Sequence, residues 1–276
     1  MRAILAAIQC EKGDLDANLD AHLAVLDDAA SERCDLVLFP EMSLTGSVEP
    51  DAHPERLIAL DHPAVTALAS ATPPHGVAAC FGIAERAADG QPYITQIVAG
   101  QGRVLGTQRK RHLGEGEEAF TAGSEDAVFD WAGVRFGIAI CAESRFDAPF
   151  DTAAAAGARL VLFPAAPGLH GRRTDEASWR AGHGWWQGCG LADAIRHARR
   201  RELWIAMAGQ AGSTIDEDFP GLAALIGPTG RCGAASLTGG REPSSLTSRC
   251  SSGYAGSSEP SPAQRVWNEP SRSTRR

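Results

Sequence analysis

Short runs of apolar residues alternate along the chain with stretches in which apolar residues recur every three or four positions. The short runs have the length of buried β-strands, and the longer spacing is typical of helices that bury one face. Strands are predicted for residues 3–9, 35–41, 76–85, 93–100, 103–110, 158–166, 203–210 and 222–227, and a hairpin turning at Ala132-Gly133 for 127–141. Helices are predicted for residues 15–30, 54–68, 147–156 and most of 176–201.

Two of the predicted strands resemble each other. CDLVLFPE at 34–41 and ARLVLFPAA at 158–166 each follow a predicted helix and run into Phe-Pro. Two similar halves that each supply buried strands and covering helices favour an α/β fold, with two sheets packed face to face and helices outside.

The pattern changes at Arg231. From there on, no apolar period is sustained, and serine, arginine and glycine accumulate. Such a segment cannot bury enough apolar surface to offset the entropy lost on ordering. We therefore predict one domain over residues 1–230, incomplete at its C-terminal end, and a disordered or loosely attached tail over 231–276.

Charge and hydropathy exclude two classes of partner. The formal net charge is -8, whereas nucleic-acid-binding domains usually carry a basic patch. No apolar run reaches the roughly 18 residues needed to span a membrane. The N-terminal stretch has a short apolar part and no cleavage site, so we interpret it as a first strand and expect a cytoplasmic protein.

The seven cysteines are odd in number and scattered, without a C-x-x-C pair. This spacing suggests neither a zinc site nor a disulfide framework, and it fits reduced thiols. We expect no metal and no cofactor.

Only two of the 26 basic residues are lysines, Lys12 and Lys110. Lys110 lies between Arg109 and Arg111, in a chain that otherwise uses arginine. Because a desolvated lysine can lose its proton and an arginine cannot, this lysine is a candidate for chemistry. The alternative is an ordinary surface lysine.

Three polar residues follow predicted strands: Glu41, Lys110 and Cys141. Ligand sites in α/β sheets collect where strands end. If the three converge, the carboxylate can take the thiol proton, the ammonium can hold the charge of a tetrahedral intermediate, and the thiol can attack a carbonyl or nitrile carbon. The alternative for Cys141 is a buried core cysteine.

Three segments in this order resemble the signature regions of the nitrilase, or carbon–nitrogen hydrolase, superfamily. They are PEMSLTG at 40–46, RKRHL at 109–113 with GEEAFTAG at 116–123, and ICAESRF at 140–146. The likeness covers about the first 230 residues. It implies a four-layer α-β-β-α sandwich, dimerisation by stacking of sandwiches, and cofactor-free hydrolysis of non-peptide carbon–nitrogen bonds.

Carried onto this chain, the resemblance implies Glu41 as general base, Lys110 as oxyanion stabiliser and Cys141 as nucleophile. It also implies a second glutamate, for which Glu117 and Glu118 compete and Glu117 is preferred. The residue after a strand-end nucleophile can contribute a backbone N–H to an oxyanion hole, which makes Ala142 a candidate.

Other polar and aromatic groups have simpler interpretations. His183, Trp185 and Trp186 are predicted to form a packing patch, because their spacing fits no metal-ligand set. Arg145 is expected to form a structural ion pair, for example with Glu41 or Glu143. Asp216, Glu217 and Asp218 are expected in a solvated loop.

The sequence thus predicts a hydrolase that acts on a small carboxamide. A nitrilase or an N-carbamoyl hydrolase is the alternative within the same chemistry, and a catalytically impaired relic with an altered C-terminus is the alternative outside it. A redox-sensing thiol ranks last because no resolving cysteine is adjacent.

Overall fold

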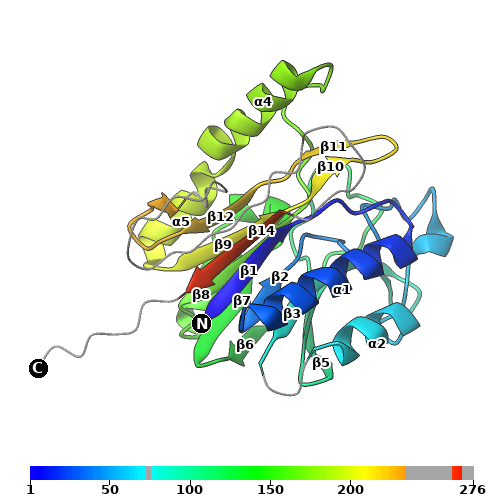
Figure 1. Ribbon diagram of the computed structural model, residues 1–276, viewed down its shortest axis with the longest axis horizontal. Helices are drawn as coiled ribbons and strands as arrows, with labels where there is room; N and C mark the ends of the chain where they lie inside the picture. The colour runs from blue at the N-terminus through cyan, green and yellow to red at the C-terminus, as the bar shows by residue number, and fades with distance from the viewer. Residues whose placement is uncertain (73–75, 234–262, 269–276) are drawn as a thin grey trace, which may run out of the picture.

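Two six-stranded sheets form the centre of the computed structural model, which describes residues 1–72, 76–233 and 263–268 (Figure 1). The first sheet has the order β14-β1-β2-β3-β4-β5. Its strands are β1 (Arg2–Ala7), β2 (Leu36–Leu38), β3 (Ala78–Arg86), β4 (Pro92–Gly100), β5 (Arg103–Arg109) and β14 (Ala263–Asn268).

The second sheet has the order β13-β12-β9-β8-β7-β6. Its strands are β6 (Val128–Trp131), β7 (Val134–Ile138), β8 (Leu160–Ala165), β9 (Trp204–Gly209), β12 (Ala223–Ile226) and β13 (Cys232–Gly233). In each sheet three neighbouring strands run parallel to one another, β1-β2-β3 in the first and β7-β8-β9 in the second. Antiparallel hairpins adjoin them, including the predicted β6–β7 hairpin, which pairs Trp131 with Val134.

Both faces of each sheet are buried, because successive residues of a strand point to opposite sides. In β1, Ala3, Leu5 and Ala7 join the apolar core between the two sheets. Ile4 and Ala6 join a second core on the outer face of the same sheet. Strands buried on both faces are continuously apolar rather than alternating, which is the pattern found in the sequence.

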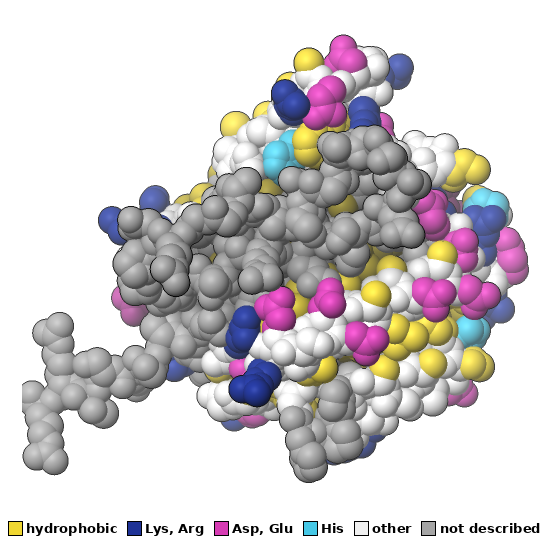
Figure 2. All heavy atoms as spheres, in the orientation of Figure 1, with side chains coloured by type: hydrophobic (Ala, Val, Ile, Leu, Met, Phe, Trp, Pro, Cys, Tyr) yellow, Lys and Arg dark blue, Asp and Glu magenta, His cyan; other side chains and the backbone are white. Residues whose placement is uncertain are grey.

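Helices cover the outer faces. α1 (Leu15–Ser31) and α2 (Pro63–Ser70) pack on the first sheet, and α3 (Ala148–Ala155) and α5 (Ala192–Arg201) pack on the second. The predicted four-layer α-β-β-α sandwich is therefore confirmed. Acidic side chains mark the solvent-facing side of α1 (Figure 2).

The predicted continuous helix over 54–68 is wrong. The chain instead forms a short 3₁₀ helix, η1 (Pro54–Arg56), an extended segment in which Ile58 bridges to Glu85, and then α2. The break lies where expected from proline chemistry, because Pro63 excludes the helical conformation for the preceding residue and suits the first turn of a helix.

Five further elements complete the described part of the chain. η2 (Cys141–Arg145) is a 3₁₀ turn after β7, and β10 (Ala211–Ser213) pairs with β11 (Asp218–Pro220). α4 (Glu176–Trp185) extends away from the sheets (Figure 1), and the π-helical turn η3 (Trp186–Gly190) follows it. None of the helices among the described residues is long and apolar enough to cross a membrane.

Part of the predicted tail has regular structure. Residues 263–268 form β14, which pairs antiparallel with β1 along its whole length, from Arg2 with Asn268 to Ala7 with Ala263. The sequence pattern did not anticipate this strand. Cys232–Gly233, also in the predicted tail, form β13, which pairs antiparallel with β12. Residues 234–262 and 269–276 of the predicted tail lie outside the described residues.

Candidate active site

The three strand-end residues lie together at one edge of the sandwich. Glu41 follows β2 and Lys110 follows β5 in the first sheet, while Cys141 follows β7 in the second sheet and begins η2. The site is therefore assembled from both sheets.

Lys110 is clamped between two carboxylates. Its Nζ lies 2.7 Å from Glu41 Oε1 and 2.5 Å from Glu117 Oε1. The Lys110 side chain is 0% exposed and the Glu41 side chain 2%. The other oxygen of Glu41 accepts a hydrogen bond from the backbone N–H of Ala166 at 3.1 Å. Both oxygens of Glu41 thus have a hydrogen-bond partner within the protein.

The charges of these groups are interdependent. Burial raises the pKa of Glu41, and the neighbouring Lys110 opposes this without overcoming it. Burial would lower the pKa of Lys110, but the neighbouring carboxylates of Glu41 and Glu117 outweigh it and the pKa is raised. Lys110 therefore remains an ammonium ion.

Cys141 is a protonated thiol at rest. Burial raises the pKa of Cys141 well above its ordinary value, and Glu41 adds to the effect while Lys110 opposes it. The thiol also lies close enough to Glu41 to oppose the rise in the pKa of that carboxyl. A carboxylate of raised pKa beside a protonated thiol is suited to take the proton as the sulfur attacks a substrate.

Of the two candidate glutamates, Glu117 contacts the lysine. Its second oxygen accepts a hydrogen bond from the backbone N–H of Gly114 at 2.5 Å, so the carboxylate is fixed at both ends. Glu118 is exposed and accepts a hydrogen bond only from Gly116 N at 3.2 Å among the contacts of the described residues. Ala142 is half-buried next to Gly114, where a Cβ would lie 3.1 Å from the Ala142 Cβ.

Glu143 joins the η2 turn, which begins at Cys141, to the segment that follows Lys110. Its side chain is fully buried. Oε2 accepts a hydrogen bond from Ile140 N at 2.8 Å, and Oε1 accepts from Arg111 N at 2.9 Å and His112 N at 3.3 Å. The carboxylate thus links the residue before Cys141 to the two residues after Lys110, a role that sequence reasoning missed.

Hydrogen bonds of Ser43 attach the loop that carries Glu41 to β3 and α1. Ser43 Oγ accepts a hydrogen bond from Gly82 N at 3.1 Å and lies 2.9 Å from Nε2 of His22 on α1. Gly82 passes so close that a Cβ there would lie 2.3 Å from Met42 N. Only glycine fits this approach of β3 to the Glu41 loop.

The remaining predicted groups lie elsewhere. Arg145 is exposed and is not the partner of Glu41 or Glu143, which bond to the groups described above. His183 bonds to the Pro220 carbonyl through Nδ1 at 2.9 Å, and Trp186 donates to the Gly168 carbonyl at 3.0 Å, so this patch packs α4 and η3 onto the body of the protein. No group of side chains suited to hold a metal ion exists among residues 1–72, 76–233 and 263–268.

The acidic loop is more than a solvated segment. Lys12 Nζ lies 2.8 Å from a carboxylate oxygen of Asp216 and 2.8 Å from one of Glu217. Asp218 belongs to β11 and accepts a hydrogen bond from Ser213. Asp216 and Glu217 are thus exposed loop residues, as expected, and their ion pairs with Lys12 also tie the β10–β11 hairpin to the N-terminal loop. Only Asp218 departs from the expectation, because it belongs to strand β11.

Comparison with known proteins gives consistent matches. Residues 4–240 match the family model of carbon-nitrogen hydrolases. The "hydrolase in pqqF 5'region" of Pseudomonas protegens is 33% identical over 169 residues, 59% of this chain and 59% of that protein. An aliphatic nitrilase of Rhodococcus rhodochrous is 28% identical over 159 residues, 50% of this chain and 43% of that protein. The chain thus spans about half the length of these curated relatives.

The fold is also found among solved structures. An amidase of the nitrilase superfamily from Nesterenkonia superposes with a TM-score of 0.73 at 23% sequence identity, over 98% of this chain and 91% of that one. At this identity the likeness concerns the fold.

Proposed function

Because the chain belongs to the carbon–nitrogen hydrolase family, we propose that it hydrolyses the carbon–nitrogen bond of a small, non-peptide carboxamide through a thioester on Cys141. The observation that carries the proposal is the buried Lys110 ammonium, 2.7 Å from Glu41 and 2.5 Å from Glu117, beside the Cys141 thiol. Solved amidases that share the fold over 98% of the chain favour an amide as the substrate.

In the first half-reaction Glu41 removes the thiol proton as sulfur bonds to the carbonyl carbon. The oxygen of the resulting tetrahedral intermediate carries a negative charge, which Lys110 and the backbone N–H of Ala142 stabilise. Glu41 then gives its proton to the leaving nitrogen, the carbon–nitrogen bond breaks, and ammonia or an amine departs. Cys141 retains the acyl group as a thioester.

In the second half-reaction Glu41 removes a proton from water, and the hydroxide attacks the thioester carbon. The carbon–sulfur bond breaks, the acid is released, and the proton returns to the Cys141 sulfur. Every proton passes through Glu41, whose raised pKa suits it to both roles. Glu117 neither gives nor takes a proton; it holds the Lys110 ammonium in place.

The proposal is tested by incubating the purified full chain with propionamide, propionitrile and N-carbamoyl-alanine and measuring ammonia release. We expect release from the amide above that from the other two, and none from Cys141→Ala. Rapid quench with propionamide should trap a propionyl group on the peptide that contains Cys141. Higher turnover of the nitrile or the carbamoyl compound would reassign the substrate class. Absence of an acyl adduct with all three, with Cys141→Ala indistinguishable from the parent, would favour the impaired relic.

A further inference from the structure

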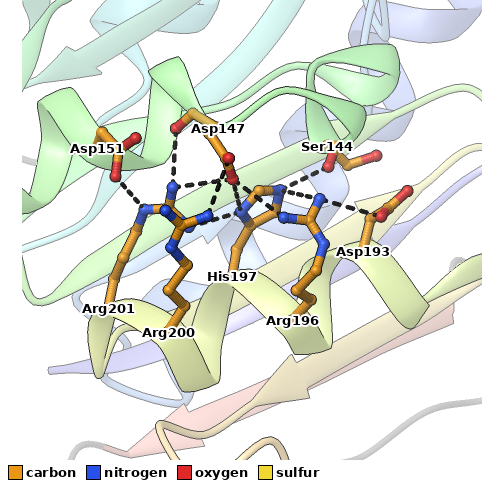
Figure 3. A network of polar contacts seen from close by, with 8 residues as sticks. All are labelled: Ser144, Asp147, Asp151, Asp193, Arg196, His197, Arg200 and Arg201. Carbon is orange, nitrogen blue, oxygen red and sulfur yellow. Dashed lines mark hydrogen bonds and ion pairs between the residues drawn. The ribbon is translucent and has the colours of Figure 1, made fainter.

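A backbone carbonyl near the C-terminal end of the turn that begins at Cys141 is held by a buried histidine. His197 on α5 has a fully buried side chain, and its Nε2 lies 2.7 Å from the Ser144 backbone oxygen (Figure 3). Its ring stacks on Phe150 of α3, with ring centroids 3.9 Å apart and planes 8° from parallel. Ser144 lies three residues after Cys141 in the same 3₁₀ turn.

The neighbours of His197 determine its tautomer. Nη1 of Arg201 lies 2.8 Å from Nδ1, and a guanidinium can only donate, so Nδ1 accepts. The ring proton therefore resides on Nε2, which donates it to the Ser144 carbonyl. Arg196 Nη2 lies 3.3 Å from Nε2, further than the Ser144 oxygen, and donates to Asp193 at 3.2 Å.

His197 is neutral in this setting. Burial lowers its pKa, and the adjacent Arg196 and Arg201 lower it further, against the opposing effects of the Ser144 carbonyl and of Asp147. Asp147 Oδ1 is 3.5 Å from His197 Nδ1. A neutral ring with a single proton has one fixed donor direction, and that direction is toward the turn.

The helix that carries His197 is fixed to the chain just beyond the turn. Three arginines of α5 converge on the carboxylate of Asp147: Arg196, Arg200 and Arg201, each at 3.0 Å (Figure 3). Arg201 also bonds to Asp151 of α3 at 2.7 Å. The position of α5 against the turn is thus determined by ion pairs as well as by the stacked rings.

The turn requires such support because it starts in a strained conformation. Cys141 has φ +44, in the left-handed region that non-glycine residues seldom adopt. Strained residues persist only where the surrounding structure over-determines them. Glu143 bonds to the N-terminal side of the turn, and His197 bonds to its C-terminal side.

We propose that His197 is a positioning residue for the nucleophile, because its Nε2–H and the Ser144 carbonyl hold the 141–145 turn in the conformation that directs Cys141 toward Glu41 and Lys110. The inference rests on the proposed function, with His197 acting through the backbone of the turn and not on the substrate. Under this proposal the reaction depends on a residue of α5 as well as on the residues at the three strand ends.

The test compares two substitutions of His197. His197→Phe keeps a ring to stack on Phe150 but removes the donor, while His197→Gln retains an N–H close to the position of Nε2. Asp193→Asn is the matched control, since it changes the Arg196 pairing at the surface without touching the turn. Each variant is assayed at least about ten degrees below its own midpoint of thermal unfolding.

Two measurements are made on each variant. The first is the rate at which iodoacetamide alkylates the Cys141 peptide, followed by mass spectrometry. The second is kcat and KM for propionamide. Because a neutral hydrogen bond contributes about 1 kcal/mol, we expect His197→Phe to lower both the alkylation rate and kcat about five- to tenfold, with KM nearly unchanged. His197→Gln should restore most of the loss, and Asp193→Asn should match the parent.

Alkylation separates this inference from the proposed function. If the parent chain alkylates at Cys141 but hydrolyses no amide, the proposed substrate fails while the positioning role is still measured. If His197→Phe alkylates at the parental rate, the positioning role is wrong even when hydrolysis proceeds. It is also wrong if His197→Gln is as impaired as His197→Phe while both unfold at the same temperature.

Discussion

Lys110 Nζ lies 2.5 Å from Glu117 Oε1, closer than its 2.7 Å separation from Glu41. The second glutamate is therefore a partner of the lysine as direct as the first. Glu117 is also fixed from the far side by Gly114 N, whereas Glu118, its neighbour in sequence, is exposed.

We expect Glu117→Gln to lower kcat for propionamide about ten- to a hundredfold, because a hydrogen bond to a charged group contributes roughly 1.5–3 kcal/mol. KM should change less, since Lys110 stabilises charge that develops only in the transition state. Glu118→Gln is the matched control and should leave both constants within about twofold of the parent. Equal effects of the two substitutions would contradict the assignment.

Glu143 should be essential to the geometry although it contacts no reacting atom. Oε1 accepts two backbone N–H groups and Oε2 accepts one, so the amide of Glu143→Gln must turn its NH₂ toward at least one donor. An unsatisfied buried N–H costs about 1–3 kcal/mol. We expect a loss of that size in the free energy of urea unfolding, and a lower rate of Cys141 alkylation.

Arg145→Gln provides the control for Glu143→Gln. Arg145 belongs to the same turn but is exposed, and its replacement should change the unfolding free energy by no more than about 0.5 kcal/mol. Parental stability and parental alkylation in Glu143→Gln would rule out the bridging role.

Alkylation of Cys141 should depend on Glu41 as a base. The pKa of the thiol is raised, so little thiolate exists at neutral pH, and the raised pKa of Glu41 places its own titration above the ordinary carboxyl range. In the parent, the rate of iodoacetamide labelling should fall as the pH drops through the pKa of Glu41. Glu41→Gln should be slower by about a hundredfold or more and should lack that acid limb. An unchanged pH profile in Glu41→Gln would show that another group takes the proton.

Stability should depend on pH through His22. Burial lowers the pKa of His22 to about 4, from the ordinary value of 6.5. As the pH falls below 6.5, His22 is protonated in the unfolded chain, whereas in the folded chain it stays neutral until about pH 4. The contribution of His22 to folding stability is therefore fully present above pH 6.5 and is lost as the pH falls toward 4. The full loss from this group is about 3 kcal/mol.

The measurement is the difference in urea-unfolding free energy between pH 7.5 and pH 4.5 for the parent and for His22→Gln. The difference should shrink by about 2–3 kcal/mol in the variant, whatever its stability at pH 7.5. His53→Gln replaces a histidine whose side chain is 46% exposed and should leave the difference as it is in the parent. A parental pH dependence in His22→Gln would mean that other groups account for the acid sensitivity.

The sequence locates Glu41 and Cys141 because each is a polar residue directly after an apolar run, and it locates Lys110 because this lysine lies between two arginines at the end of a predicted strand. Strand ends on one side of a sandwich come together. The sequence cannot locate Glu143 or His197 by the same reasoning. Their partners are backbone groups, which every residue has, and the contact from His197 to Ser144 spans 53 positions along the chain. Such contacts depend on the tertiary arrangement and leave no local pattern.

The misjudged elements have local physical causes. The apolar spacing around Pro54 continues to Leu68, but a periodic pattern does not register that Pro63 interrupts the backbone before α2. Residues 263–268 lie in a segment rich in serine, arginine and glycine that sustains no apolar period, so the sequence pattern gave no indication of a strand. In the structure they pair with the otherwise unpaired edge of β1, and backbone hydrogen bonds to an exposed edge are available to almost any sequence.

Because the site is assembled from two sheets, the packing between the sheets determines how its reacting groups are placed relative to one another. Glu41 and Lys110 move with one sheet and Cys141 moves with the other, so the distance between sulfur and base is set by the side chains packed between them, such as Leu38 and Ile138. Replacing side chains of that interface with larger or smaller ones would shift Glu41 and Lys110 relative to Cys141. Reactivity of Cys141 would then report sheet separation, even in variants whose unfolding temperature is unchanged.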